Sequence, residues 1–121
     1  MERDAWVKGL FQSIDEQDVE AFLAVLSDHV LFRFGNAEPV RGKAAVGAVV
    51  RGFFASLKSL RHEVADTWER PGVVICHGFV TYTRQDASIL RVPFANILKL
   101  KADLISEYLI YVDASELYNS A

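Results

Sequence analysis

The last third of the chain carries two strand-like segments whose alternate positions are apolar on both faces. They cover residues 89–101 and 105–112. A strand with one wet face alternates between apolar and polar positions, so this pattern predicts a sheet that is covered on both sides. The helices upstream can cover one side only. We therefore expect a second copy of the chain on the other side, against an apolar patch made of Ile75, Phe79, Ile97, Leu109 and Tyr111.

Three helices are predicted before these strands, over residues 5–14, 19–26 and 43–60. In each of them the apolar residues recur at spacings of three and four and form one stripe. Asp18 stands where it can cap the second helix. A short strand over residues 30–34 and a loop over residues 35–42 separate the second helix from the third.

From His62 onward the helical spacing gives way to alternation. Strands are predicted over residues 62–69, 73–84, 89–101 and 105–112, and the short turns between them favour antiparallel pairing. The predicted fold class is therefore α+β, with the helices on one face of a curved sheet. The length of 121 residues predicts a single domain over residues 1–121.

Composition narrows the range of partners. The formal net charge is −3 and no segment concentrates Lys and Arg, which argues against nucleic acid. The single cysteine excludes an intrachain disulfide. No signal peptide or membrane-length apolar run is present, so the expected setting is cytoplasmic, with no membrane partner.

Several motifs, in this order, resemble the nuclear-transport-factor-2-like superfamily in its SnoaL-like branch. The end of the family's first helix, its second helix and its first strand are resembled by residues 14–22 and 26–32. Its "G-x-x-A-I" motif at the start of the third helix is resembled by residues 40–46. Its closing strand is resembled by residues 105–113. The resemblance implies a cone-shaped, strongly curved, mostly antiparallel sheet wrapped around the N-terminal helices, with a pocket in between. Relatives include ketosteroid isomerases, limonene epoxide hydrolases, polyketide cyclases and non-catalytic binding domains, so fold alone does not choose a function.

The acids of the related isomerases are missing at the matching positions. Arg33 takes the place of their general-base aspartate, and an arginine does not abstract protons near neutral pH. Their donor tyrosine and donor acid are replaced by Leu10 and Asn96. An isomerase mechanism of that kind is therefore not expected.

The Asp-Arg-Asp set of the related epoxide hydrolases is missing too. Gly78, Val80 and Ile110 stand at the matching positions. Asp113, which follows the family's closing tyrosine, is expected to anchor the end of the strand.

The resemblance leaves a pocket whose predicted ligand-binding residues are Arg33, Asn96, Tyr82, Tyr108 and Trp68. A guanidinium suits a carboxylate, phenolate or enolate, and an asparagine suits a carbonyl. The alternatives are that Arg33 pairs with Glu38, Glu107 or another acid, that Asn96 hydrogen-bonds to the backbone, and that the aromatic residues pack in the core.

Cys76 and His77 are neighbours on one strand and point to opposite faces, so they do not share a site. Cys76 is expected in the core and His77 on the outer face of the sheet. His29 and His62 stand at the starts of elements, where solvated positions are common. No metal-binding spacing and no phosphate-binding loop is present, and we expect no metal and no cofactor.

The sequence thus predicts a protein that binds a small, mostly apolar ligand carrying a carbonyl or acidic group. One interpretation is a cofactor-independent isomerase, cyclase or lyase. The alternative is a non-catalytic dimeric binding or assembly module.

Overall fold

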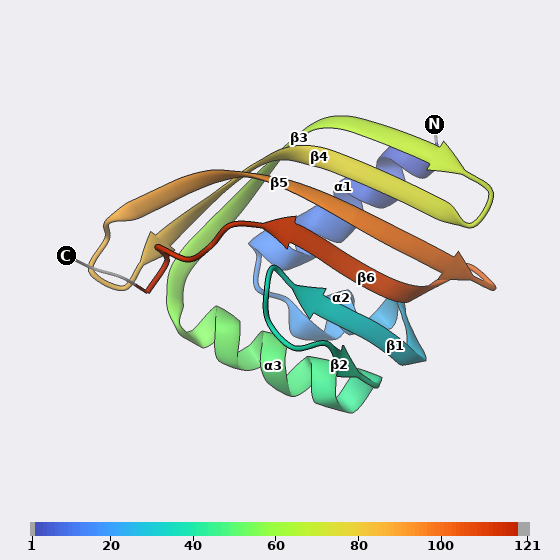
Figure 1. The fold of residues 1–121 in the computed structure, drawn as a ribbon, viewed down its shortest axis with the longest axis horizontal. Coiled ribbons are helices and arrows are strands. Elements are labelled where there is room, and N and C mark those ends of the chain that lie inside the picture. Colours follow the sequence, from blue (N-terminus) through green and yellow to red (C-terminus); the bar gives the residue numbers. More distant parts are fainter. Residues whose placement is uncertain (1, 119–121) are drawn as a thin grey trace.

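The computed structural model describes residues 2–118 and shows three helices behind one curved sheet (Figure 1). The strands lie in the order β2-β1-β6-β5-β4-β3, so the first long strand lies beside the last. The elements are α1 (Glu2–Asp15), α2 (Val19–Ala24), β1 (Leu26–Phe34), β2 (Val40–Arg41), α3 (Lys43–Ala55), β3 (Leu57–Arg70), β4 (Val73–Arg84), β5 (Ile89–Lys101) and β6 (Leu104–Val112).

The predicted α+β fold is confirmed. Strands β3 to β6 form an antiparallel meander, and β1 joins it by parallel pairing with β6. The helices lie on the inner side of the sheet's curvature (Figure 1). None of the helices in residues 2–118 is long and apolar enough to cross a membrane.

Two helices end earlier than predicted. The second stops at Ala24 and the third at Ala55, where Ser56 closes the helix by donating from its hydroxyl to the carbonyl of Phe53 (2.7 Å). Leu57 and Leu60 continue the helical spacing, yet both are buried in β3 because the strand has an irregular register between Leu57 and Ser59. An irregularity of this kind puts residues three apart on one face of a strand. The two-residue strand β2, in the expected loop, was not predicted.

The core lies between the helices and the inner face of the sheet. Alternate residues of β4 are fully buried there, as the twofold period of a strand requires. The cap at Asp18 is confirmed, since its carboxylate accepts from the backbone N–H of Ala21 (3.1 Å). Val49 lies on the exposed side of α3. The helices contribute Val7, Leu10, Phe11, Phe22, Val46, Val50 and Phe54.

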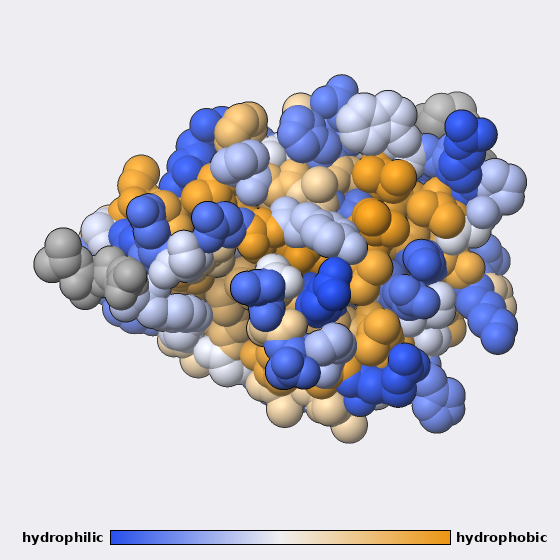
Figure 2. Space-filling model, in the orientation of Figure 1, coloured by the Kyte–Doolittle hydropathy of each residue, from blue (hydrophilic) through white to orange (hydrophobic). Residues whose placement is uncertain are grey.

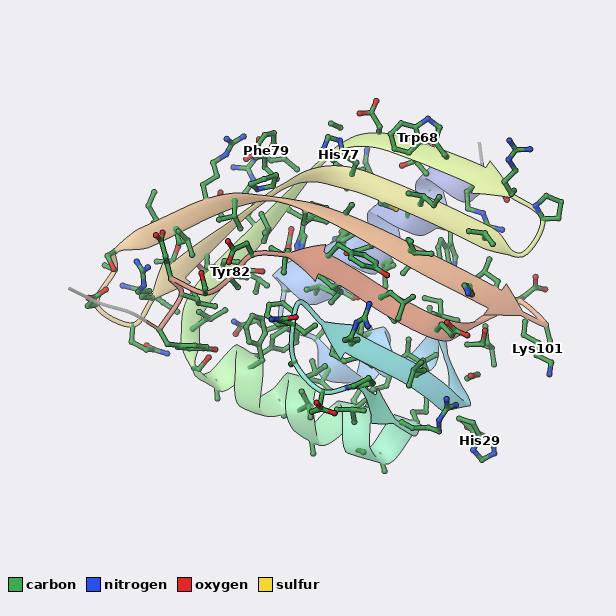
Figure 3. All side chains as sticks on the ribbon, in the orientation of Figure 1. His29, Trp68, His77, Phe79, Tyr82 and Lys101 are labelled. Carbon is green, nitrogen blue, oxygen red and sulfur yellow. The ribbon has the colours of Figure 1, made fainter. Side chains whose placement is uncertain are left out.

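Within residues 2–118, no helix lies on the outer face of the sheet. Register aligns Trp68, Ile75, Ile97, Leu109 and Arg33 in one row across β3, β4, β5, β6 and β1. Apolar side chains gather over the middle of this face in Figure 2. Figure 3 shows Trp68, His77 and Phe79 along the outer side of β3 and β4.

Candidate functional site

A cavity of about 50 Å³ lies inside the core, between α2, α3 and the sheet. Aromatic side chains fill most of the space between helices and sheet, and this cavity is what they leave open. Four lining residues carry polar groups: His62, Tyr82, Asn96 and Tyr108. The rest of the lining is apolar, namely Ile14, Phe22, Phe32, Phe34, Val50, Phe53, Phe54, Leu60, Val80, Phe94 and Ile110.

Asn96 is the polar residue at the centre of the sheet's inner face. It lies on β5 between Cys76 of β4 and Ile110 of β6, and only 2% of it is exposed. Its side-chain oxygen Oδ1 is buried and has no hydrogen-bond partner within residues 2–118. Leaving such a group unpaired costs about 1–3 kcal/mol. The sequence-based prediction placed Asn96 in the pocket, and the structure places it there.

Tyr82 and Tyr108 also line the cavity, as predicted. Burial raises the pKa of both phenols, with smaller contributions from Tyr118 at Tyr82 and from Cys76 and Asp15 at Tyr108. Both hydroxyls therefore stay protonated at neutral pH and can donate to a ligand oxygen. The Tyr108 ring is held by aromatic contacts with Phe22 and Phe32.

His62 and Asp15 form a hydrogen-bonded pair beside the cavity. Asp15 is the last residue of α1, and its Oδ2 accepts from the backbone N–H of His62 (2.9 Å). Its Oδ1 lies 2.7 Å from the ring nitrogen Nδ1 of His62. Because a carboxylate only accepts, Nδ1 carries the proton and donates it. This leaves Nε2 as the nitrogen available to a ligand.

The expected inward orientation of Arg33 is wrong. Arg33 stands on β1 between Phe32 and Phe34, which both line the cavity, so its side chain faces the outer side. There it donates to the hydroxyl of Tyr111 (3.1 Å) and lies over the Tyr111 ring. Glu107, one alternative partner, pairs instead with Lys99.

Trp68 does not line the cavity either. It is 54% exposed and lies opposite Ile75 on the outer face. The reason is a bulge at Ala65, where the register of β3 on β4 shifts between Val64 and Asp66. An extra residue reverses which positions face inward, so Thr67 faces Cys76 and Trp68 turns outward.

The remaining candidate residues, Cys76, His77 and Asp113, do not line the cavity. Burial raises the pKa of the Cys76 thiol to about 11, so Cys76 is a core residue and not a thiolate nucleophile. His77 lies on the outer face, 3.4 Å from Asp66, as expected. Asp113 accepts from the backbone N–H of Ser115 and anchors the chain after β6. Within residues 2–118, no three His, Cys, Asp or Glu residues are grouped as a metal site requires.

Asp15 and His62 are the site residues that sequence reasoning missed. They lie 47 positions apart, and no motif links them. One signal was present: His62 stands two positions after Leu60, so a strand that begins before Leu60 puts both on the buried face. The prediction began the strand at His62, where that signal is lost.

The family model for the SnoaL-like domain matches residues 7–108, which is most of the chain. The protein belongs to the SnoaL-like family. Residues 7–108 include all four polar residues of the cavity and every other lining residue except Ile110. No curated protein is similar enough in sequence to count as a match.

Solved structures show the same nuclear-transport-factor-2-like fold. An NTF2-like protein of unknown function from Burkholderia pseudomallei superposes with a TM-score of 0.84 at 14% identity, covering 93% of this chain and 92% of that one. TerC, co-crystallised with polyporic acid, gives 0.80 at 12% identity, with the same two coverages. An LEH-like epoxide hydrolase from M. tuberculosis gives 0.79 at 11% identity, covering 93% and 84%. At these identities the likeness establishes the fold alone.

Proposed function

We propose that this SnoaL-like protein binds a small, mostly apolar molecule in the cavity, with a carbonyl or acidic group of that molecule paired to Asn96. The observation that carries the proposal is the unpaired Oδ1 of a side chain that is 2% exposed. An apolar residue of the same size would be more stable there. A buried acceptor left unpaired at that place indicates a hydrogen-bond donor from outside the chain, such as the O–H of a carboxylic acid. A carbonyl ligand is paired by the same side chain once its amide turns and presents the NH₂ group.

The rest of the lining supports the same class of ligand. Apolar walls with a few convergent polar groups are typical of small-molecule sites. The protonated phenols of Tyr82 and Tyr108 favour ligand oxygens, and an Asn96 amide turned about its last bond presents its NH₂ to a carbonyl. TerC, with the same fold, was crystallised with an organic acid, polyporic acid.

The cavity of about 50 Å³ sets a condition on the ligand. Benzene occupies a cavity of roughly 150 Å³ in another protein. A ring-sized ligand therefore requires lining side chains to move. Phe53 is the candidate for that movement, because it is only half-buried and touches the rings of Phe34 and Tyr82 near the edge of the cavity.

The proposal is tested with a panel of small probes: phenol, phenylacetate, acetophenone, 1-indanone and 2-indanone. Binding is measured by ligand-observed NMR and by the shift in melting temperature. We expect at least one probe to bind wild type, and Asn96→Leu to weaken it by roughly tenfold, the equivalent of one lost hydrogen bond. Asn96→Leu should keep or raise the stability of the free protein.

Tyr111→Phe on the outer face is the matched control and should bind like wild type. The proposal fails if no probe binds, or if Asn96→Leu binds the probes as tightly as wild type. A sharply destabilised Asn96→Leu variant with unchanged binding would show that Asn96 serves the backbone.

The alternative, a non-catalytic assembly module, is favoured by one observation: the apolar row on the helix-free face of the sheet. This face and the cavity lie on opposite sides of the same strands. An assembly role can therefore coexist with ligand binding.

A further inference from the structure

His62 lies in the wall between two spaces. On one side is the cavity that holds Asn96; on the other is an open cleft of about 700 Å³ between α1 and β3, lined by Asp15, His62 and polar residues of α1. Its ring packs against Phe11 (centroids 4.8 Å apart) and Phe94 (5.2 Å). The side chain is 11% exposed and that of Asp15 is 25% exposed. The pair thus reaches both the enclosed space and the solvent side.

Neighbouring side chains hold the imidazole ring of His62 in one orientation. Asp15 accepts from both the backbone N–H and the Nδ1–H of His62, and the two phenylalanine rings hold the plane of the imidazole. A carboxylate on Nδ1 keeps Nε2 unprotonated in the neutral ring and stabilises the imidazolium once a proton arrives.

We infer that Nε2 of His62 takes a proton from a ketone bound in the cavity and that water exchanges this proton before it returns to carbon, with Asp15 as the positioning residue of His62. The inference rests on the proposed function, since Asn96 must hold the ligand oxygen. Asn96 and His62 both line this cavity.

The step is balanced without any oxidant or reductant. Nε2 takes the proton from the carbon beside the carbonyl, and the C–H electron pair becomes the carbon–carbon double bond of an enolate. The carbonyl π pair moves onto oxygen, which accepts hydrogen bonds from the Asn96 amide and a protonated tyrosine. Return of a proton from the imidazolium to the same carbon restores the ketone; return to a different carbon of a conjugated system isomerises it.

The test uses the unmodified chain and needs no natural substrate. In D₂O, wild type should speed the incorporation of deuterium beside the carbonyl of 1-indanone or 2-indanone, followed by proton NMR. His62→Gln should reduce the acceleration by about 10² or more, the usual contribution of a general base. His77→Gln, on the outer face, is the matched control and should exchange like wild type.

Asp15→Asn tests the positioning role separately. Its amide still has an oxygen for the His62 backbone N–H, but its NH₂ would face Nδ1 and move the ring proton to Nε2. Heteronuclear NMR of the imidazole should show the Nδ1–H form in wild type and the Nε2–H form in Asp15→Asn. Exchange should fall with ketone binding retained.

Three results would overturn the inference. If a ketone binds and wild type does not accelerate exchange, His62 is not a base and the binding proposal stands alone. If phenol binds but neither indanone does, the ketone class is wrong. If no probe binds at all, this inference falls together with the proposed function.

Discussion

Three buried side chains that carry a proton should make the protein less stable at alkaline pH. Burial raises the pKa of the Cys76 thiol from 9.0 to about 11 and raises those of Tyr82 and Tyr108. As pH rises past 9, the unfolded chain loses these protons first, so the free energy of unfolding falls. The contribution of Cys76, on the order of 2 kcal/mol, is fully present below pH 9 and is lost as pH rises to about 11. The contributions of Tyr82 and Tyr108 begin to fall near pH 10, the ordinary pKa of a phenol, and continue to fall at higher pH. Chemical denaturation at a series of pH values measures this slope; Cys76→Ala and Tyr108→Phe should flatten it, and Tyr111→Phe, which changes an exposed phenol, is the control. Equal slopes in all four proteins would contradict the assignment.

The alternation of inward and outward positions along each strand explains which site residues could be predicted from the sequence. Asn96 and Tyr82 follow unbroken twofold periods and lie where the sequence put them. Tyr108 also lines the cavity, although an irregular register of β5 on β6 breaks the twofold period between Ile105 and Tyr108. The alignment with the related isomerases predicted that Arg33 faces inward. The local alternation indicates the opposite, because the neighbouring Phe32 and Phe34 both lie on the inner face. Trp68 was not predictable from alternation, since the bulge at Ala65 is set by packing between strands.

Among the elements, β3 depends on one glycine of its neighbour. A Cβ at Gly78 would overlap the carbonyl oxygen of Glu63, next to the bulge that follows His62. Gly78→Ala should therefore push β3 away and destabilise the fold by about 3 kcal/mol, measured by denaturant unfolding. Gly52→Ala is the matched control: nothing lies near its Cβ, and alanine in a helix should stabilise by about 1 kcal/mol. Two substitutions of equal sign and size would refute this account.

Element types were largely predictable and their ends were not. The period of apolar residues identified every helix and every long strand. At both misplaced helix ends, a leucine that belongs to the following strand continues the apolar stripe of the helix. The spacing of apolar residues therefore does not show where these helices end. The pairing of β1 with β6 had no local signal at all, because it depends on residues far apart in the chain.

For the whole molecule, we propose a homodimer through the helix-free face of the sheet. Its apolar residues include Ile75, Ile97 and Leu109 in one row, flanked by Tyr111. Sedimentation at micromolar concentration should give the mass of two chains. Leu109→Glu should weaken association at least 10²-fold while leaving probe binding in the cavity intact, because burying an unpaired charge is unfavourable. Val49→Glu, on the exposed side of α3, should remain dimeric. A monomeric wild type would refute the proposal.

Because β1 pairs with β6, the cavity between helices and sheet can form only after β6 has been synthesised. The contact between Arg33 of β1 and Tyr111 of β6 joins residues 78 apart, and β6 is the last strand along the chain. During synthesis, α1, α2 and β1 emerge long before β6, the strand that closes the sheet around them. Contacts of such long sequence separation slow folding. Until β6 has left the ribosome, the apolar inner faces of the helices and of β1 lack their cover, and exposed apolar surface of this kind favours aggregation.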